Sequence, residues 1–300
     1  INAISVFHQV GIEVYADAVM NHLNGGEALA PYECTPNAAY PDSGWVIFNY
    51  PYGSGRFKKN ASHFYPNSQT CDVNPPYHGA DDPIFQFGMW LAHDRQFVKD
   101  SLVVWGQYLK NVIGFDGFRL DAVKGIDPYF MGAWIQGVNQ GGFNVAEYYG
   151  SQNDIGYWLN QTQNVYGGNV SMFDFPLRFV LKDMCNNTSG SFDMNNLDNA
   201  GLVNAGISGF DVSTFVENHD LDRIGYDGSI DNGHDPIISN KDMAYAYILT
   251  AEGRPSVFFK DYFDYGFAGK IDTLIWIRKT FIYGGTTKRI IKTDAGGAIQ

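Results

Sequence analysis

Three carboxylates in this sequence follow short apolar runs: Asp121, Glu147 and Asp220. The run from Phe115 to Leu120 predicts a buried strand, with Arg119 and Asp121 crowded at its carboxyl end. Two opposite charges beside an apolar run are costly to bury unless they form an ion pair with each other. A carboxylate that a neighbouring guanidinium keeps ionised is a candidate nucleophile. A purely structural Arg–Asp ion pair would explain the same two residues equally well.

Taken together, the three carboxylates point to sugar chemistry. The carboxyl ends of parallel strands share one edge, so all three are expected in one cleft. A retaining glycosidase needs two carboxylates about 5 Å apart, one ionised and one protonated. A third carboxylate can stabilise the positive charge that develops at the sugar carbon. His22 and His219, predicted at strand ends on the same face, could donate hydrogen bonds to sugar hydroxyls. Lys124 could reach a hydroxyl on the leaving-group side, or it could simply be solvated.

Short apolar runs alternate with stretches of helical periodicity along most of the chain, a pattern typical of a parallel barrel. The predicted strands are residues 12–17, 115–120, 143–147, 170–175, 212–216 and 255–259. A closed barrel needs about eight strands. We therefore expect two strand–helix units to precede residue 1.

Composition narrows the function classes. The chain has 300 residues and a net charge of −12, which argues against nucleic acid or an anionic membrane as a partner. No apolar run approaches the roughly 20 residues that span a bilayer. Aromatic residues make up 16% of the chain, which suits stacking on sugar rings but also suits an aromatic core.

The three cysteines cannot all pair within the chain. Cys34 and Cys71 flank one irregular region, so a disulfide between them is a reasonable expectation in a secreted protein. Five Asn-X-Ser/Thr sequons also fit a secretory route. We expect an extracellular, secreted protein.

Four blocks of the sequence resemble, in order and approximate separation, the signature regions of the α-amylase family of glycoside hydrolases. They are residues 17–22 (DAVMNH), 117–125 (GFRLDAVKG), 145–148 (VAEY) and 215–220 (FVENHD). Residues 173–177 and 244–250 are most similar to the liquefying bacterial amylases. The resemblance covers essentially the whole chain.

The resemblance implies catalytic roles. Asp121 would be the nucleophile that forms the glycosyl-enzyme, and Glu147 the acid/base that protonates the leaving oxygen and later activates water. Asp220 would distort the sugar and stabilise the oxocarbenium-like state. Arg119 would orient Asp121 and keep it ionised.

The resemblance also implies binding roles. His22 and His219 would bind the glucose unit at the cleavage point, and Lys124 with Gly125 would lie on the leaving-group side. Asn21 would be a calcium ligand through its side chain, and Gly125 another through its backbone carbonyl.

This sequence departs from the family pattern at the metal site. Trp90 stands where a calcium-ligating Asp is expected, and an indole offers only an N–H donor. Calcium wants six to eight oxygen ligands. Calcium is therefore a possible cofactor that Trp90 makes doubtful, and we expect it to be weak or absent.

The implied fold is a (β/α)8 TIM barrel, incomplete at the N-terminus, with an irregular β-rich subdomain inserted after the first strand present. Residues 1–22 and 94–285 would form the catalytic barrel, residues 23–93 the inserted domain, and residues 286–300 the start of a C-terminal β domain.

The implied activity is retaining hydrolysis of internal α-1,4-glucosidic bonds in starch- or glycogen-type glucans, by a protein that is a monomer when full-length. Two alternatives stay open. One is a related enzyme of other specificity, such as an oligosaccharide-releasing amylase, a transglycosylase or an α-1,6-cleaving enzyme. The other is a non-catalytic carbohydrate-binding homologue, which the complete carboxylate set disfavours.

Overall fold

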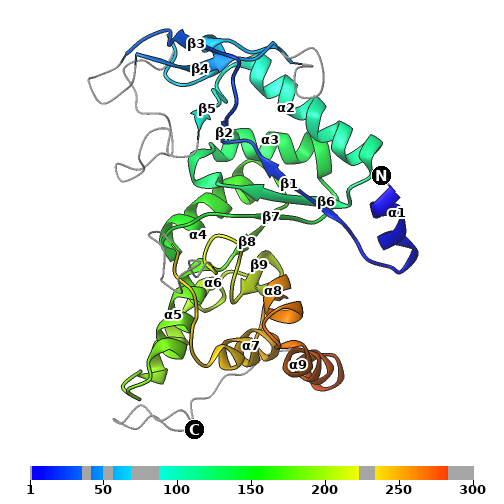
Figure 1. The fold of residues 1–300 in the computed structure, drawn as a ribbon, viewed down its shortest axis with the longest axis vertical. Helices are drawn as coiled ribbons and strands as arrows, with labels where there is room; N and C mark the ends of the chain where they lie inside the picture. Colours follow the sequence, from blue (N-terminus) through cyan, green and yellow to red (C-terminus); the bar gives the residue numbers. More distant parts are fainter. Residues whose placement is uncertain (1, 36–41, 50–56, 69–87, 223–233, 283–300) are drawn as a thin grey trace. The chain divides into compact units, whose positions relative to one another are not determined.

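The computed structural model describes residues 2–35, 42–49, 57–68, 88–222 and 234–282 (Figure 1). The chain divides into two compact units. The first comprises residues 1–149 and 157–170, and the second residues 150–156 and 171–300. Each unit is built on three parallel strands, and each is described by itself.

In the first unit, β6 (Gly117–Asp121) lies between β1 (Tyr15–Val19) and β7 (Asn144–Ala146), and both pairings are parallel. The register places Asp17 beside Arg119, and Arg119 beside Val145. Because side chains alternate along a strand, Arg119 and Asp121 share one face of β6, while Phe118 and Leu120 are fully buried on the other.

Gly117, the first residue of β6, allows the three strands to approach closely. A Cβ atom at this position would lie 1.9 Å from the carbonyl oxygen of Phe143 and 2.8 Å from the ring of Tyr15. No other residue type fits between these neighbours without moving the backbone.

Helices α1 (Asn2–Gln9), α2 (Gln96–Tyr108) and α3 (Pro128–Asn139) belong to this unit. A π-helical turn, Leu109–Ile113, extends α2 and ends at Gly114, whose φ of 96° is the left-handed conformation that closes a helix. Asp127 begins α3 by accepting a hydrogen bond from the Tyr129 amide at 2.7 Å, and Pro128 follows at the first helical position.

The segment between β1 and α2 forms small antiparallel sheets. β3 (Ala28–Pro31) pairs with β4 (Ser43–Ile47), and β2 (His22–Leu23) pairs with β5 (Met89–Trp90). The described part of residues 23–93 is irregular and contains these short strands, while the bounds of an inserted domain stay a prediction. Cys71 lies outside the described residues, and so does the pairing predicted for it with Cys34.

In the second unit, β9 (Val212–Phe215) lies between β8 (Ser171–Phe173) and β10 (Arg254–Ser256), again with parallel pairing. Its helices are α5 (Phe175–Asn186), α6 (Gly201–Asn204), α7 (Lys241–Thr250), α8 (Phe259–Phe263) and α9 (Ala268–Phe281). Asp174 begins α5, and its carboxylate accepts a hydrogen bond from the Leu177 amide at 3.0 Å. The same carboxylate accepts a hydrogen bond from the Leu202 amide of α6, also at 3.0 Å, and so links the two helices.

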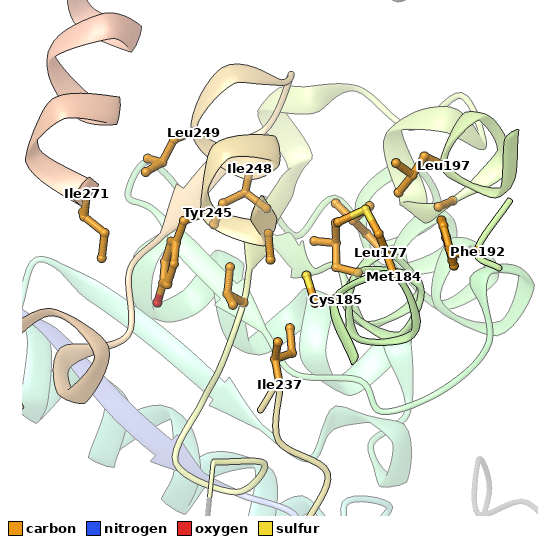
Figure 2. Close-up of a cluster of buried hydrophobic side chains, with 14 residues drawn as sticks. Leu177, Met184, Cys185, Phe192, Leu197, Ile237, Tyr245, Ile248, Leu249 and Ile271 are labelled. Atoms are coloured by element: carbon orange, nitrogen blue, oxygen red, sulfur yellow. The ribbon is translucent and has the colours of Figure 1, made fainter. Parts of the chain in front are cut away.

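Figure 2 shows the core of this unit, where side chains of α5 and α7 meet. Leu181, Cys185, Tyr245 and Ile248 are fully buried there, and Ile271 of α9 packs against the same cluster. Burial raises the pKa of the Cys185 thiol to about 11, so this free cysteine is an unreactive core residue at neutral pH.

The six parallel strands of the described residues are those the sequence predicts, and all of them are shorter than predicted. The sequence analysis did not predict the helices α4 (Gln152–Asn160), α6 and α8, although the buried residues Ile155, Trp158 and Leu159 recur at helical spacing in α4. No helix among the described residues is both long and apolar enough to cross a membrane.

Candidate active site

Arg119 is the centre of the site in the first unit. Its Nη1 donates to Asp17 Oδ1 at 2.7 Å and to Asp121 Oδ1, and its Nη2 donates to Glu147 Oε2 at 2.6 Å. One guanidinium thus holds the predicted nucleophile and the predicted acid/base together. The sequence had placed Arg119 beside Asp121, and the strand register adds Glu147 and Asp17.

The charges around Arg119 set its protonation. Burial by itself would lower the pKa of the guanidinium, but Glu147, Asp17 and Asp121 outweigh burial and raise the pKa above its ordinary value. Arg119 is therefore a permanent cation within a cluster of three carboxylates. The side chains of Arg119, Asp121 and Glu147 are each less than one-fifth exposed, so water screens their interactions only in part.

Glu147 follows β7 directly, and backbone hydrogen bonds fix it against the end of β6. Its amide donates to the Leu120 carbonyl, and its carbonyl accepts from the Val123 amide, both at 2.9 Å. Between Leu120 and Val123, Ala122 adopts a left-handed φ of 46°, which is unfavourable for a residue with a Cβ. Strained backbone that its surroundings hold in place is a frequent feature of functional sites.

His22 lies elsewhere than the sequence predicted. It does not end a barrel strand: β1 ends at Val19, and His22 belongs to β2, opposite Trp90. Burial lowers the pKa of His22, and its electrostatic interaction with Asp121 only partly offsets this. His22 is therefore neutral at pH 7 and can donate a hydrogen bond without adding a charge.

Lys124 and Gly125 follow β6 in a 3₁₀ turn, Val123–Gly125. Gly125 is buried, and its amide donates to the Ala122 carbonyl at 3.2 Å. Lys124 is partly buried rather than fully solvated. Their place on the leaving-group side of the substrate stays a prediction.

The described residues do not fit a calcium site. They contain no group of three or more His, Cys, Asp or Glu side chains arranged to hold a metal ion. Asn21 Oδ1 is buried without a hydrogen-bond partner in this part of the chain, as a ligand oxygen would be. Trp90 is buried opposite the neighbouring His22 and supplies no oxygen from its side chain. Asn21 and the Gly125 carbonyl would be two neutral ligands, too few for calcium.

Asp220 and His219 belong to the second unit, in the segment that follows β9. Asp220 lies five residues and His219 four residues beyond Phe215, so neither residue ends the strand itself. The Asn218 side chain accepts the amides of Asp220 and Leu221 at 3.0 and 2.9 Å, forming a tight turn. The side chains of His219 and Asp220 are both more than half exposed. The convergence of Asp220 with Asp121 and Glu147 in one cleft stays a prediction.

Two sets of charged residues received no catalytic or binding role from the sequence. The first is Asp17, which ends an apolar run and begins the first signature block. The second is a buried ion-pair network beside the Asp220 turn, whose members are Arg178, Glu217, Asp222, Lys241 and Asp261. The available signal was Arg178 itself, an isolated charge in the apolar stretch from Phe175 to Leu181.

Several known proteins resemble this chain in sequence or in fold. No family model matches the chain. It is similar to the glucan 1,4-alpha-maltohexaosidase of Bacillus sp. (strain 707), with 31% identity over 326 residues, covering 94% of this chain and 60% of the relative. It is also similar to the alpha-amylase of Bacillus licheniformis, with 29% identity over 328 residues, covering 94% of this chain and 61% of the relative. The chain thus spans about three-fifths of the length of these relatives.

Solved structures show the same fold. An alpha-amylase from Malbranchea cinnamomea aligns with a TM-score of 0.61 and 17% identity, covering 93% of this chain and 57% of that one. The alpha-amylase of Geobacillus thermoleovorans, solved with acarbose, aligns with a TM-score of 0.55 and 18% identity, covering 86% of this chain and 51% of that one.

The fold is therefore the (β/α)8 barrel, of which this chain carries part, with strand-end carboxylates of the kind that glycosidases use. The chain belongs to the α-amylase family of glycoside hydrolases.

Proposed function

We propose that the protein carrying this chain is a retaining glycoside hydrolase that cleaves internal α-1,4-glucosidic bonds of starch- or glycogen-type glucans. The observation that carries the proposal is the Arg119 cluster, which holds Asp121 and Glu147 on one guanidinium at neighbouring strand ends. Retaining chemistry needs two carboxylates close together, one on each side of the scissile bond.

In the first step, a carboxylate oxygen of Asp121 attacks the anomeric carbon and the glycosidic C–O bond breaks. Glu147, once protonated in the substrate complex, gives its proton to the leaving oxygen. In the second step, Glu147 takes a proton from water while the water oxygen attacks the same carbon, and the ester bond to Asp121 breaks. Inversion occurs twice, so the product keeps the α configuration.

The remaining residues bind the glucan or stabilise the transition states. Neutral His22 donates to a hydroxyl of the glucose unit under attack, with His219 as a second donor. As the family resemblance implies, Asp220 would stabilise the positive charge that builds up on the ring in both transition states. Lys124 and Gly125 contact the sugar on the leaving-group side. No step needs a metal ion.

One relative favours a second candidate function. The similarity to a protein named glucan 1,4-alpha-maltohexaosidase supports an enzyme that releases oligosaccharides of one length from the same bonds. The chemistry at Asp121 and Glu147 would be unchanged. Only the size distribution of the products separates this candidate from random internal cleavage.

We also propose that the protein is secreted and monomeric. The sequons and the Cys34/Cys71 spacing support secretion, but a relative named cytoplasmic alpha-amylase, from Escherichia coli, is also similar to the chain. Fractionation of the source cells tests the location. Sedimentation of the purified protein tests the oligomeric state.

The decisive experiment is a reducing-sugar assay on soluble starch with the whole protein that carries this chain. Asp121→Asn and Glu147→Gln should each lower kcat by at least about 10²-fold, since acid–base assistance alone contributes roughly 10²–10⁴-fold. Either variant retaining more than about a tenth of wild-type activity would overturn the assignment. A wild-type protein that binds glucan without cleaving it would instead point to the non-catalytic homologue.

A further inference from the structure

Arg178, on α5, is a fully buried cation. Its Nε donates to the Val216 carbonyl at 3.3 Å, its Nη2 to Glu217 Oε2 at 3.0 Å, and its Nη1 to Asp235 Oδ2 at 3.0 Å. Nη2 also donates to the Asp235 carbonyl. A buried charge persists only where such partners compensate for the loss of water.

These contacts fix the residues on both sides of the turn that carries His219 and Asp220. Val216 and Glu217 leave β9 just before the turn that carries His219 and Asp220, and Asp235 lies on the segment that packs beside that turn. Glu217 Oε1 accepts the Ile237 amide at 2.5 Å, and the Asp235 amide donates to the Leu221 carbonyl at 3.1 Å. Arg178 therefore links both flanks of the turn to α5.

Two further side chains contact Asp222, at the C-terminal end of the turn: Lys241 of α7, and Tyr265, which follows α8. Tyr265 donates to Asp222 Oδ2 at 2.8 Å, and Lys241 Nζ lies 3.7 Å from Asp222 Oδ1 and 3.5 Å from Glu217 Oε1. Asp222 and Glu217 are both buried. The turn is thus fixed on both sides, while the Asp220 side chain is 58% exposed.

We propose that Arg178 is a positioning residue for the glucan-cleaving reaction: it holds the backbone of residues 216–222 so that Asp220 is presented in one fixed orientation. This inference rests on the proposed hydrolase function. To stabilise a transition state, a negative charge must already be in position before the positive charge develops on the substrate. An exposed carboxylate on an immobilised backbone meets this requirement. Misplacing such a group by about 1 Å can cost roughly 10²-fold in rate.

The principal test replaces both members of the buried ion pair. Arg178→Met alone leaves the Glu217 carboxylate buried with less compensation and can unfold the protein. The double variant Arg178→Met/Glu217→Gln removes the uncompensated charge and keeps a side-chain oxygen for the Ile237 amide. Lys182→Met is the matched control, since Lys182 also contacts Asp235, at 3.0 Å, but from a partly exposed position.

The readouts are kcat and KM on soluble starch, the thermal melt, and hydrogen exchange of the Leu221 and Asp222 amides, all in the whole protein. In the double variant we expect kcat to fall at least tenfold, KM to stay within about threefold, and the melt to stay cooperative, because an interaction made only in the transition state is lost. The two amides should exchange faster. Lys182→Met should match the wild type in every readout.

Wild-type kcat in the double variant would overturn the proposal, and so would a loss of kcat without faster exchange at the two amides. A non-cooperative melt in both Arg178→Met and the double variant would assign Arg178 a purely structural role, and this result would also overturn the proposal. A wild-type protein inactive on starch would mean that the proposed function fails. The exchange data would still decide separately whether Arg178 holds the turn.

Discussion

Arg119 and Glu147 form an ion pair between neighbouring parallel strands, with 2.6 Å between Nη2 and Oε2. Their positions are 28 residues apart in sequence, and the pairing of β6 with β7 brings them together. The same guanidinium binds Asp121, so a single side chain sets the relative position of the two carboxylates that the reaction needs.

Arg119→Lys should therefore lower kcat strongly. A lysine ammonium is a compact point charge and lacks the planar fork that serves several carboxylates at once. We expect a loss of at least tenfold in kcat with the protein still folded, measured on soluble starch. Arg95→Lys is the matched control, because Arg95 forms an ion pair with Glu33 in the inserted region, at 2.7 Å. Equal losses in the two variants would contradict the central role of Arg119.

Gly117→Ala should destabilise the first unit. The new methyl group would lie 1.9 Å from the Phe143 carbonyl oxygen, so β6 and β7 must separate. Overpacking of this kind typically costs 1–3 kcal/mol, and a clash with backbone should cost about 3 kcal/mol or more. Chemical denaturation measures the change in the free energy of unfolding. Gly141→Ala, where nothing lies within 4 Å of the added carbon, should stay within about 0.5 kcal/mol of the wild type.

Stability should fall in mild acid because of His93. This histidine is buried, stacks on Phe130 and bonds to the Met20 carbonyl through Nε2 at 2.8 Å. Burial lowers its pKa from 6.5 to about 4. Between these values the unfolded chain binds a proton that the folded chain does not, so stability is lost as pH falls from 6.5 towards 4.

The expected contribution of His93 between pH 7 and pH 5 is about 2 kcal/mol. Urea denaturation of the wild type and of His93→Gln at the two pH values measures it. The variant should be less stable at pH 7 but should lose about 2 kcal/mol less than the wild type on acidification. An unchanged pH dependence in His93→Gln would show that His93 is not the responsible group.

Calcium should have little effect on stability, because no group of three or more His, Cys, Asp or Glu among the described residues could hold a metal ion, and Trp90 supplies no oxygen from its side chain. The melting temperature in excess EDTA and in millimolar calcium should agree within about 1 °C. A ligand at a hundred times its dissociation constant would stabilise by about 2.7 kcal/mol, which is readily seen. A rise of several degrees with calcium that disappears in Asn21→Ala would show that a site exists.

The sequence alone determined the strand–helix alternation and the positions of Asp121 and Glu147, because both depend on local patterns. An apolar run followed by a carboxylate predicts a strand end wherever that strand lies in the sheet. Element boundaries were less well determined, since the strands proved short and the helices α4 and α8 were not predicted.

Only the tertiary structure decided which charges meet. The ion pairs of Arg119 with Asp17 and Glu147 depend on strand register, and the contacts of Arg178 with Glu217 and Asp235 join positions about 40 and 57 residues apart. His22 shows the same limit: its local sequence suggested a barrel strand end, but pairing with Trp90 placed it in a separate sheet. A local pattern specifies an element and its buried face, whereas a contact between elements depends on how distant segments pack, which no short stretch of sequence encodes.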